Sequence, residues 1–311
     1  MKTIAGNIRT PARCGGHGLA ATAAVVSGIA VYTNGIAVRR FGDATNYTTA
    51  KNLVAALVLV FVAVVAHGAR GTRVAITTAP KAGIAAVAVA GSVPFVLFFE
   101  GLSRVNSTDA AFLHKTLVVW VAIGAVAVLG ERLRWHHLVA IVAIGWGQHE
   151  LVGGFGLGDP GSGETLITAA TVIWAVEVVV TKRMLATTPA AAVSAARMGG
   201  GAIVLLTWAA LRGALGDVVA IGWSGLGWVV LTGVVLAAFV ALWHRALAVA
   251  PAIDVTAILA GGAVVTALLN GASGRASIGP AALGLALVAA GALMVAVQMR
   301  PTATPSGAAA R

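Results

Sequence analysis

The chain contains apolar segments that are long enough to cross a lipid bilayer, and very short polar turns separate them. Residues 97–147 show this best: one apolar segment ends near Arg104, residues 110–129 form a second, and Leu138 opens a third. A helix needs about 20 apolar residues to cross the hydrocarbon core. Backbone groups in that core must be hydrogen-bonded internally, and these runs lack strand alternation, so we expect membrane-spanning helices.

The composition indicates an integral membrane protein. Charged residues make up only 10% of the 311 residues, whereas a soluble domain has about 25%. A net charge of +11 would suggest nucleic-acid binding in a soluble protein. Here the basic residues lie between apolar segments, where anionic headgroups attract them, so we expect the lipid bilayer as partner and no nucleic acid. The single cysteine, Cys14, excludes an intramolecular disulfide.

Ten apolar segments follow one another in two sets of five. We expect helices at 19–38, 53–65, 82–102, 110–129 and 138–152, then at 166–180, 190–211, 223–243, 253–269 and 281–297. The second of them is short, and residues 47–50 can extend it towards the interface. A Gly- and Asp-rich stretch separates the sets. The expected organisation is a tail at 1–17, a first repeat at 18–153, a linker at 154–161, a second repeat at 162–298 and a disordered tail at 299–311.

The two sets also resemble each other in sequence. Residues 100–109 align with residues 245–254, and after one gap Gly130 and Gly147 align with Gly274 and Gly291. An odd number of helices per set forces the two copies into opposite orientations, which is the inverted-repeat plan of secondary transporters. The predicted fold is therefore an all-α integral membrane protein with ten transmembrane helices in two inverted five-helix repeats.

Loop charges predict the orientation. Of the 21 Lys and Arg residues, Lys115 and Arg197 lie within segments. With the N-terminus inside, thirteen of the others face the cytoplasm and six face outward, with Arg39 and Arg40 as the clear exception. Because Lys and Arg are enriched in cytoplasmic loops, both termini are predicted to be cytoplasmic in a multi-pass protein of the cytoplasmic membrane.

Short motifs around the fourth segment resemble a known family. Small and polar residues precede it at Ser107, Asp109, Ala110 and Ala111. A Leu-Gly-Glu-Arg turn follows it at 129–132, and a Gly-containing helix is expected next at 138–152. In order, spacing and recurrence this resembles the EamA-type transporters of the drug/metabolite transporter superfamily. The resemblance implies a permease with a cavity between the two repeats. Such a permease would export small organic metabolites or drugs by alternating access. No cofactor is expected, and a homodimer is left open.

Polar residues within the fourth segment are candidates for binding a substrate or a coupling ion, since a charge at the centre of a span costs about 2.5–3.5 kcal/mol. Lys115 breaks the repeat symmetry, because its counterpart is Ala260. It either contacts a substrate carboxylate, forms a structural ion pair with Glu100, or reaches the outer headgroups. His114 either titrates in a proton-coupled cycle or bonds a backbone carbonyl at a helix contact.

Five further positions complete the candidates. Glu177 and Arg197 lie at similar depth on the sixth and seventh segments, which predicts a buried ion pair, either structural or broken in one transport state. Trp120 packs between helices or lines a cavity for an organic substrate. Gly130 and Glu131 are interpreted as a structural turn, with the carboxylate reaching nearby arginines or a neighbouring loop.

The sequence shows no nucleotide loop, metal cluster or catalytic triad, so transport is expected to draw on ion gradients. Two other classes of function stay open. One is an intramembrane enzyme that uses His114, Lys115 or Glu177. The other is a membrane sensor that transports nothing.

Overall fold

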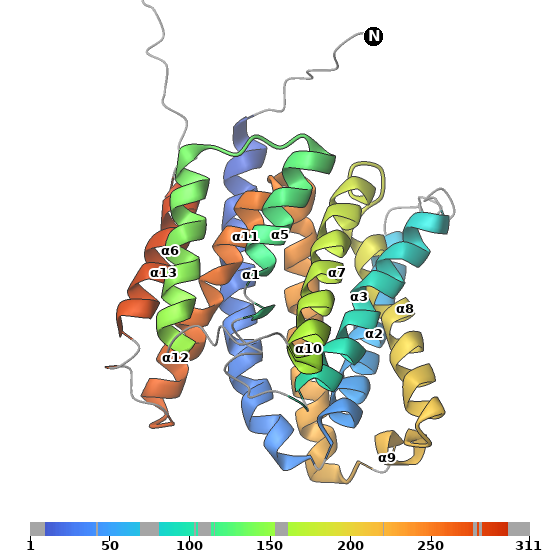
Figure 1. Cartoon of the computed structure of the whole chain (residues 1–311). Coiled ribbons are helices and arrows are strands. Elements are labelled where there is room, and N and C mark those ends of the chain that lie inside the picture. Colours follow the sequence, from blue (N-terminus) through green and yellow to red (C-terminus); the bar gives the residue numbers. More distant parts are fainter. Residues whose placement is uncertain are drawn as a thin grey trace, which may run out of the picture.

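The structure is a computed structural model, and every regular element among its described residues is helical (Figure 1). The described residues are 10–41, 43–68, 81–102, 104, 113–114, 116–152, 161–219, 221–275, 279 and 282–297. Lys115 lies outside these described residues, and so does most of the predicted linker, at 154–160.

The first set of helices extends to Val152. Its elements are α1 (Thr10–Ala37), the 3-10 turn η1 (Val38–Arg40), α2 (Ala44–Gly68), α3 (Lys81–Leu102), α5 (Leu117–Gly124), the π-helical turn η2 (Ala125–Leu129) and α6 (Trp135–Val152). The second set follows with α7 (Ser162–Met184), α8 (Ala190–Leu211), the short α9 (Leu215–Val219), α10 (Trp223–Val249), α11 (Ala252–Ala260), α12 (Gly262–Ala272) and α13 (Ala282–Val297).

The composition of these helices is that of a multi-pass membrane protein. Among the described residues, seven spans are long and apolar enough to cross a bilayer: they lie in α1, α2, α3, α7, α8, α10 and in α11 together with α12. The α5–η2 segment and α13 are shorter apolar helices. Helix α6 carries three histidines, a glutamine and a glutamate, which lower its hydropathy. The count of ten membrane crossings therefore stays a prediction.

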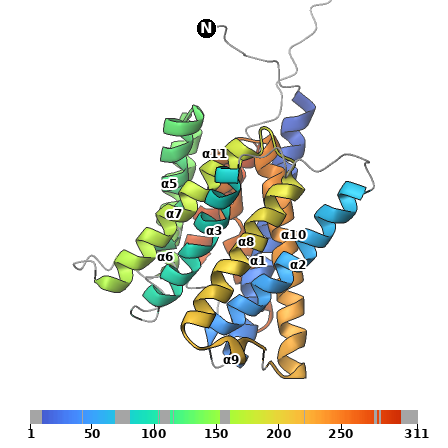
Figure 2. The ribbon, with the colours of Figure 1, turned by 90° about the vertical axis from the view of Figure 1, so that its right-hand side faces the viewer.

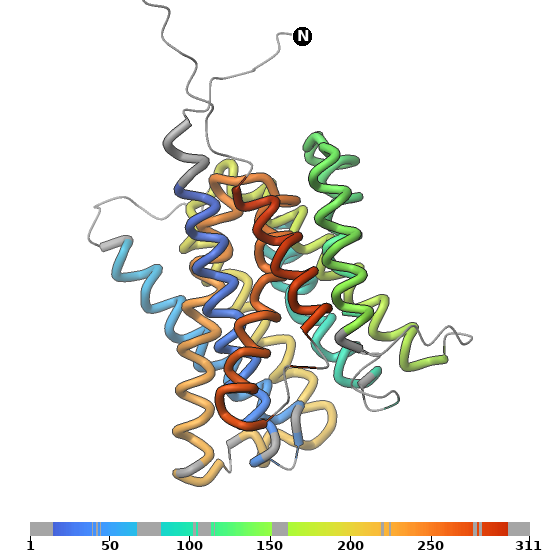
Figure 3. Tube along the Cα trace, turned by 90° about the vertical axis from the view of Figure 1, so that its left-hand side faces the viewer, coloured from blue at the N-terminus to red at the C-terminus, as the bar shows by residue number. Residues whose placement is uncertain are grey.

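The packing of the helices is symmetric between the two sets. When two helices pack together, their counterparts in the other set also pack together. Helix α3 packs on α7 as α1 packs on α10, α3 packs on α8 as α2 packs on α10, and α5 packs on α7 as α1 packs on α11. Two further strong pairs, α6 with α13 (Figure 3) and α2 with α8 (Figure 2), join equivalent helices. Helix α1 begins and α13 ends at the same end of the bundle, which we call the terminus end (Figure 1). This arrangement supports the predicted inverted repeat.

Glycines at aligned positions have the same backbone roles. A Cβ atom on Gly147 would lie 2.5 Å from the carbonyl oxygen of Gly284, and one on Gly291 would lie 2.9 Å from that of Ala140, so both permit close packing of α6 on α13. Gly130 and Gly274 both adopt left-handed backbone, with φ of 68° and 66°, where a side chain would be strained. The predicted turn at Gly130 therefore has its counterpart at Gly274.

Three predicted boundaries differ from the structure. The tail expected through His17 is helical from Thr10, because Gly16 packs closely on Ala250 and the His17 side chain is buried. The second helix begins at Ala44, well before residue 53, since the Tyr47 hydroxyl bonds inside the bundle. The ninth helix, expected to be continuous, breaks at Gly261 between α11 and α12.

Candidate functional site

A cavity of about 570 Å³ lies in the centre of the bundle. Its described lining comes from α1, α3, α5, α7, α8 and α10–α13, so both sets of helices contribute. Most of the lining is apolar, with aromatic side chains at Phe95, Trp174, Phe239 and Trp243. The polar members are Ser27, His114, Glu177, Arg197, Thr256, Thr266 and Asn270. A mainly apolar cavity with a few convergent polar groups is typical of a site for a small organic molecule.

Aromatic rings form one wall of this cavity. The His114 ring lies 4.9 Å from the Trp174 ring and 5.5 Å from the Phe98 ring, both edge-on, and Phe95 meets Trp174 at 5.2 Å. The rings come from α3, α7 and the segment before α5. Edge-to-face rings at these separations attract one another and hold their positions. The wall therefore offers a fixed surface to a flat or apolar part of a ligand.

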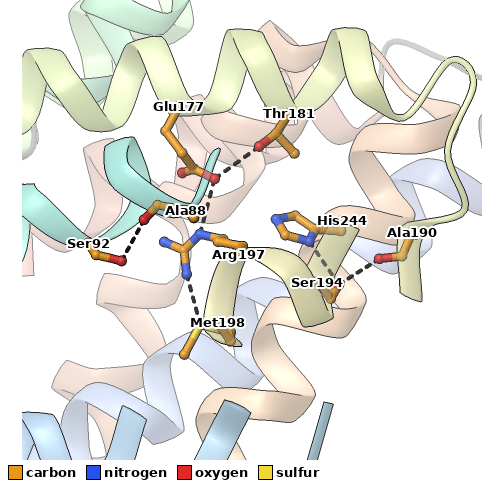
Figure 4. A network of polar contacts seen from close by, with 9 residues as sticks. All are labelled: Ala88, Ser92, Glu177, Thr181, Ala190, Ser194, Arg197, Met198 and His244. Atoms are coloured by element: carbon orange, nitrogen blue, oxygen red, sulfur yellow. Dashed lines mark hydrogen bonds and ion pairs between the residues drawn. The ribbon is translucent and has the colours of Figure 1, made fainter. Parts of the chain in front are cut away.

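The ion pair predicted between Glu177 and Arg197 is present at the edge of the cavity (Figure 4). Arg197 Nε donates to Glu177 Oε1 at 3.0 Å, and the Thr181 hydroxyl donates to the same oxygen at 3.0 Å. The Glu177 side chain is only 4% exposed. Because a lone charge in such a place is very costly, each member of the pair compensates the charge of the other. The pair gives the cavity both a positive and a negative group.

A second pair of polar groups lies close by on α8 and α10 (Figure 4). The Ser194 hydroxyl donates to the carbonyl oxygen of Ala190 at 2.8 Å, and it contacts Nδ1 of the buried His244 at 2.8 Å. Sequence reasoning missed His244 because it stands beside Arg245 near the expected end of a segment, where a polar residue raises no question.

Other predicted candidates lie away from the cavity. The Glu100 carboxylate binds Arg104 at 2.7 Å on an exposed part of α3, and its predicted pairing with Lys115 lies outside the described residues. Trp120 is 37% exposed, its indole N–H donates to Thr116, and it is not among the described residues that line the cavity. The tryptophans of the cavity are Trp174 and Trp243.

Glu131 caps a helix of the second set. Its carboxylate accepts the backbone N–H groups of Ala252 at 2.7 Å and Ile253 at 3.1 Å, the first two residues of α11. These donors have no partner within their own helix, and the positive end of the helix dipole adds attraction. The Gly130–Glu131 turn thus connects the first set to the second at the terminus end.

We expect Glu131→Ala to lower the free energy of unfolding by about 2 kcal/mol, because two charge-assisted hydrogen bonds to α11 are lost. Glu131→Gln keeps an acceptor oxygen and should lose less. Thermal unfolding in detergent measures both, with Glu150→Ala, an exposed glutamate on α6, as control. Equal melting temperatures for the Ala variant and the unaltered protein would contradict the capping role.

Comparisons with known proteins agree with this architecture. Residues 15–147 match the EamA-like transporter family. That match covers the first set of helices through most of α6 and confirms the resemblance found in the sequence. By its description, that family consists of transporters.

Solved structures add evidence on the fold. One, described only as the crystal structure of a protein, superposes with a TM-score of 0.76 at 19% identity, over 91% of this chain and 96% of that one. At this identity the likeness shows the fold alone, and it extends well beyond the segment that matches the family. None of the curated proteins matches the chain in sequence.

Proposed function

We propose that the chain is a secondary active transporter that exports small organic metabolites or drugs across the cytoplasmic membrane by alternating access, driven by protons. The observation that carries the proposal is the central cavity, which helices of both sets line. Its aromatic wall suits a molecule with a flat apolar part, and the Glu177–Arg197 pair suits polar groups of either sign. In alternating access, the two sets move about such a site and expose it to each side in turn.

Closure at one end supports the same proposal. On the terminus side of the cavity, α10, α11 and the turn between them contribute buried side chains to the main core, among them Leu247, Ala250, Ile253 and Val255. Helices α1, α6 and α7 contribute to the same core. A transporter needs a barrier of this kind on one side of its site while the other side admits substrate.

Transport by the purified protein in sealed vesicles tests the function. The probes are a panel of labelled amphipathic aromatic compounds of positive, negative and zwitterionic charge, with and without an imposed pH gradient. We expect at least one compound to cross faster with the gradient, and an ionophore that removes the gradient to abolish the gain. Folded protein that moves no compound in either condition would contradict the proposal.

Both termini are proposed to lie in the cytoplasm, which the excess of Lys and Arg in the loops on that side supports. A reporter enzyme that is active only outside the cytoplasm should be silent when fused to the C-terminus, and a cytoplasmic reporter at the same place should be active. Activity of the outside reporter would show that Arg39 and Arg40 are the better guide to orientation.

A further inference from the structure

The Glu177–Arg197 ion pair uses only part of its hydrogen-bonding capacity. A single bond of 3.0 Å joins Arg197 Nε to Glu177 Oε1, and the Thr181 hydroxyl donates to the same oxygen. Arg197 Nη1 faces the sulfur of Met198, which is a weak acceptor. Among the described residues nothing bonds Arg197 Nη2 or Glu177 Oε2, and Figure 4 shows both atoms outside the dashed contacts. The pair thus keeps one donor group and one acceptor oxygen for another molecule.

Both unused atoms belong to residues of the cavity wall, and both residues are held in place. Glu177 and Arg197 line the cavity, and neither unused atom is among the unpartnered polar atoms of the described residues that are sealed from contact. The Arg197 stem packs on α3 at Gly91, where a Cβ atom would lie 3.1 Å from Arg197 Cγ. Because the two side chains are ordered before a ligand arrives, binding costs little further ordering of the protein.

The aromatic wall of the cavity continues from this pair. Trp174 precedes Glu177 by three residues on α7, so the two side chains lie on the same side of the helix, about one turn apart. The His114 ring lies 4.9 Å from the Trp174 ring and extends the wall. Helices α11 and α12 line the cavity with small side chains, at Ala260 and Ala263, which leave room for a ligand. A flat ring that lies against the wall can therefore reach the ion pair with its edge.

The chemistry of the two unused atoms favours an uncharged ligand. An N–H group and a carbonyl oxygen side by side, as in a cyclic amide, donate to Glu177 Oε2 and accept from Arg197 Nη2. Hydrogen bonds to charged groups are strong and fix the orientation of the ligand. An anion or a cation would also meet the member of the pair that has the same charge. A zwitterion would lose the hydration of two charges in a mainly apolar cavity, which costs more than the desolvation of an amide.

We propose that the cavity binds neutral planar heterocycles that carry an N–H group next to a carbonyl oxygen. The N–H group donates to Glu177 Oε2, the carbonyl oxygen accepts from Arg197 Nη2, and the ring lies against Trp174. The bond between Arg197 Nε and Glu177 Oε1 stays in place, so the ligand adds two hydrogen bonds and no net charge. This inference rests on the proposed transport function, and it names the class of substrate that the cavity selects.

Calorimetric titration of the purified protein in detergent tests this class without a transport step. The first probe is carbostyril, a neutral bicyclic amide, and its matched partner is N-methylcarbostyril, which lacks the N–H donor. Quinaldate, an anion, and the amino acid tryptophan, a zwitterion, have ring systems of similar size. We expect carbostyril to bind about tenfold more tightly than each of the others, because methylation removes a bond to a charged group and the charged probes lose more hydration. Equal or tighter binding of any of the three, or no binding of carbostyril, would overturn the proposal.

The double substitution Glu177→Leu with Arg197→Met tests the assignment to the ion pair. It removes both charges together and should abolish the preference for carbostyril over its N-methyl partner. The control is Glu150→Leu with Arg134→Met, which makes the same changes at two exposed positions and should keep the preference. A preference that survives in the first variant would overturn the assignment, and the probes in the unaltered protein decide alone if that variant does not fold. If carbostyril binds as expected but vesicles move no compound, the site stands and the proposed function fails; if vesicles move other compounds and carbostyril does not bind, the function stands and this inference fails.

Discussion

Replacement of Arg197 by methionine is expected to lower the free energy of unfolding by about 3–5 kcal/mol, the largest loss that we predict for a single substitution. Methionine has a similar length and keeps the apolar contacts of the stem. The Glu177 carboxylate would then stay buried with only the Thr181 hydroxyl as a donor in place of the guanidinium. Thermal unfolding in detergent measures the loss.

The double substitution Glu177→Gln with Arg197→Met separates charge from packing. Because it removes both charges together, it should recover much of the stability that Arg197→Met alone loses. Transport should fail in the double variant if the pair also binds substrate, and should persist if the pair is only structural. Losses that simply add up in the double variant would show that the two residues do not depend on each other.

Filling the cavity is the second change with a large expected effect. Ala260 lines the cavity on α11, and Ala260→Phe places a phenyl ring in it. Substrate binding should weaken about tenfold or more, a loss of at least about 1.4 kcal/mol in binding free energy. Transport should fall with it, while the melting temperature changes little, since the ring enters open space.

The matched control for this substitution is Leu268→Phe on the neighbouring helix α12, where Leu268 is exposed on the outer surface of the bundle. It adds an aromatic ring to the neighbouring helix without entering the cavity. Initial transport rates in vesicles with equal amounts of inserted protein compare the two. Equal rates for Ala260→Phe and Leu268→Phe would show that substrate does not pass through this cavity.

The sequence predicted the helices well because apolar runs of the right length have few alternatives in a bilayer. It predicted the Glu177–Arg197 pair for a related reason, since two opposite charges at equal depth in an apolar bundle must find each other. It missed the break at Gly261, because a glycine pair within an apolar run also occurs in continuous membrane helices.

Contacts between distant segments were out of reach. Asp254 on α11 contacts His17 on α1 and His137 on α6. Each of these residues stands near the expected end of a segment, where a polar residue is unremarkable. Glu131 was expected to bind arginines or a nearby loop, and its acceptor role for α11 depends on the packing of the two sets. Trp120 and Trp174 look alike in sequence, but only the orientation of their helices decides which one faces the cavity.

Access to the cavity from both sides of the membrane is a direct test of alternating access. A cysteine is placed at Ala263, a small cavity residue on α12, in the Cys14→Ser protein. An impermeant maleimide is then added to one side or the other of sealed vesicles of known orientation. Alternating access predicts labelling from either side, with the ratio of the two rates shifted by a transported compound or by pH. Labelling from one side only, under every condition of substrate and pH, would contradict it.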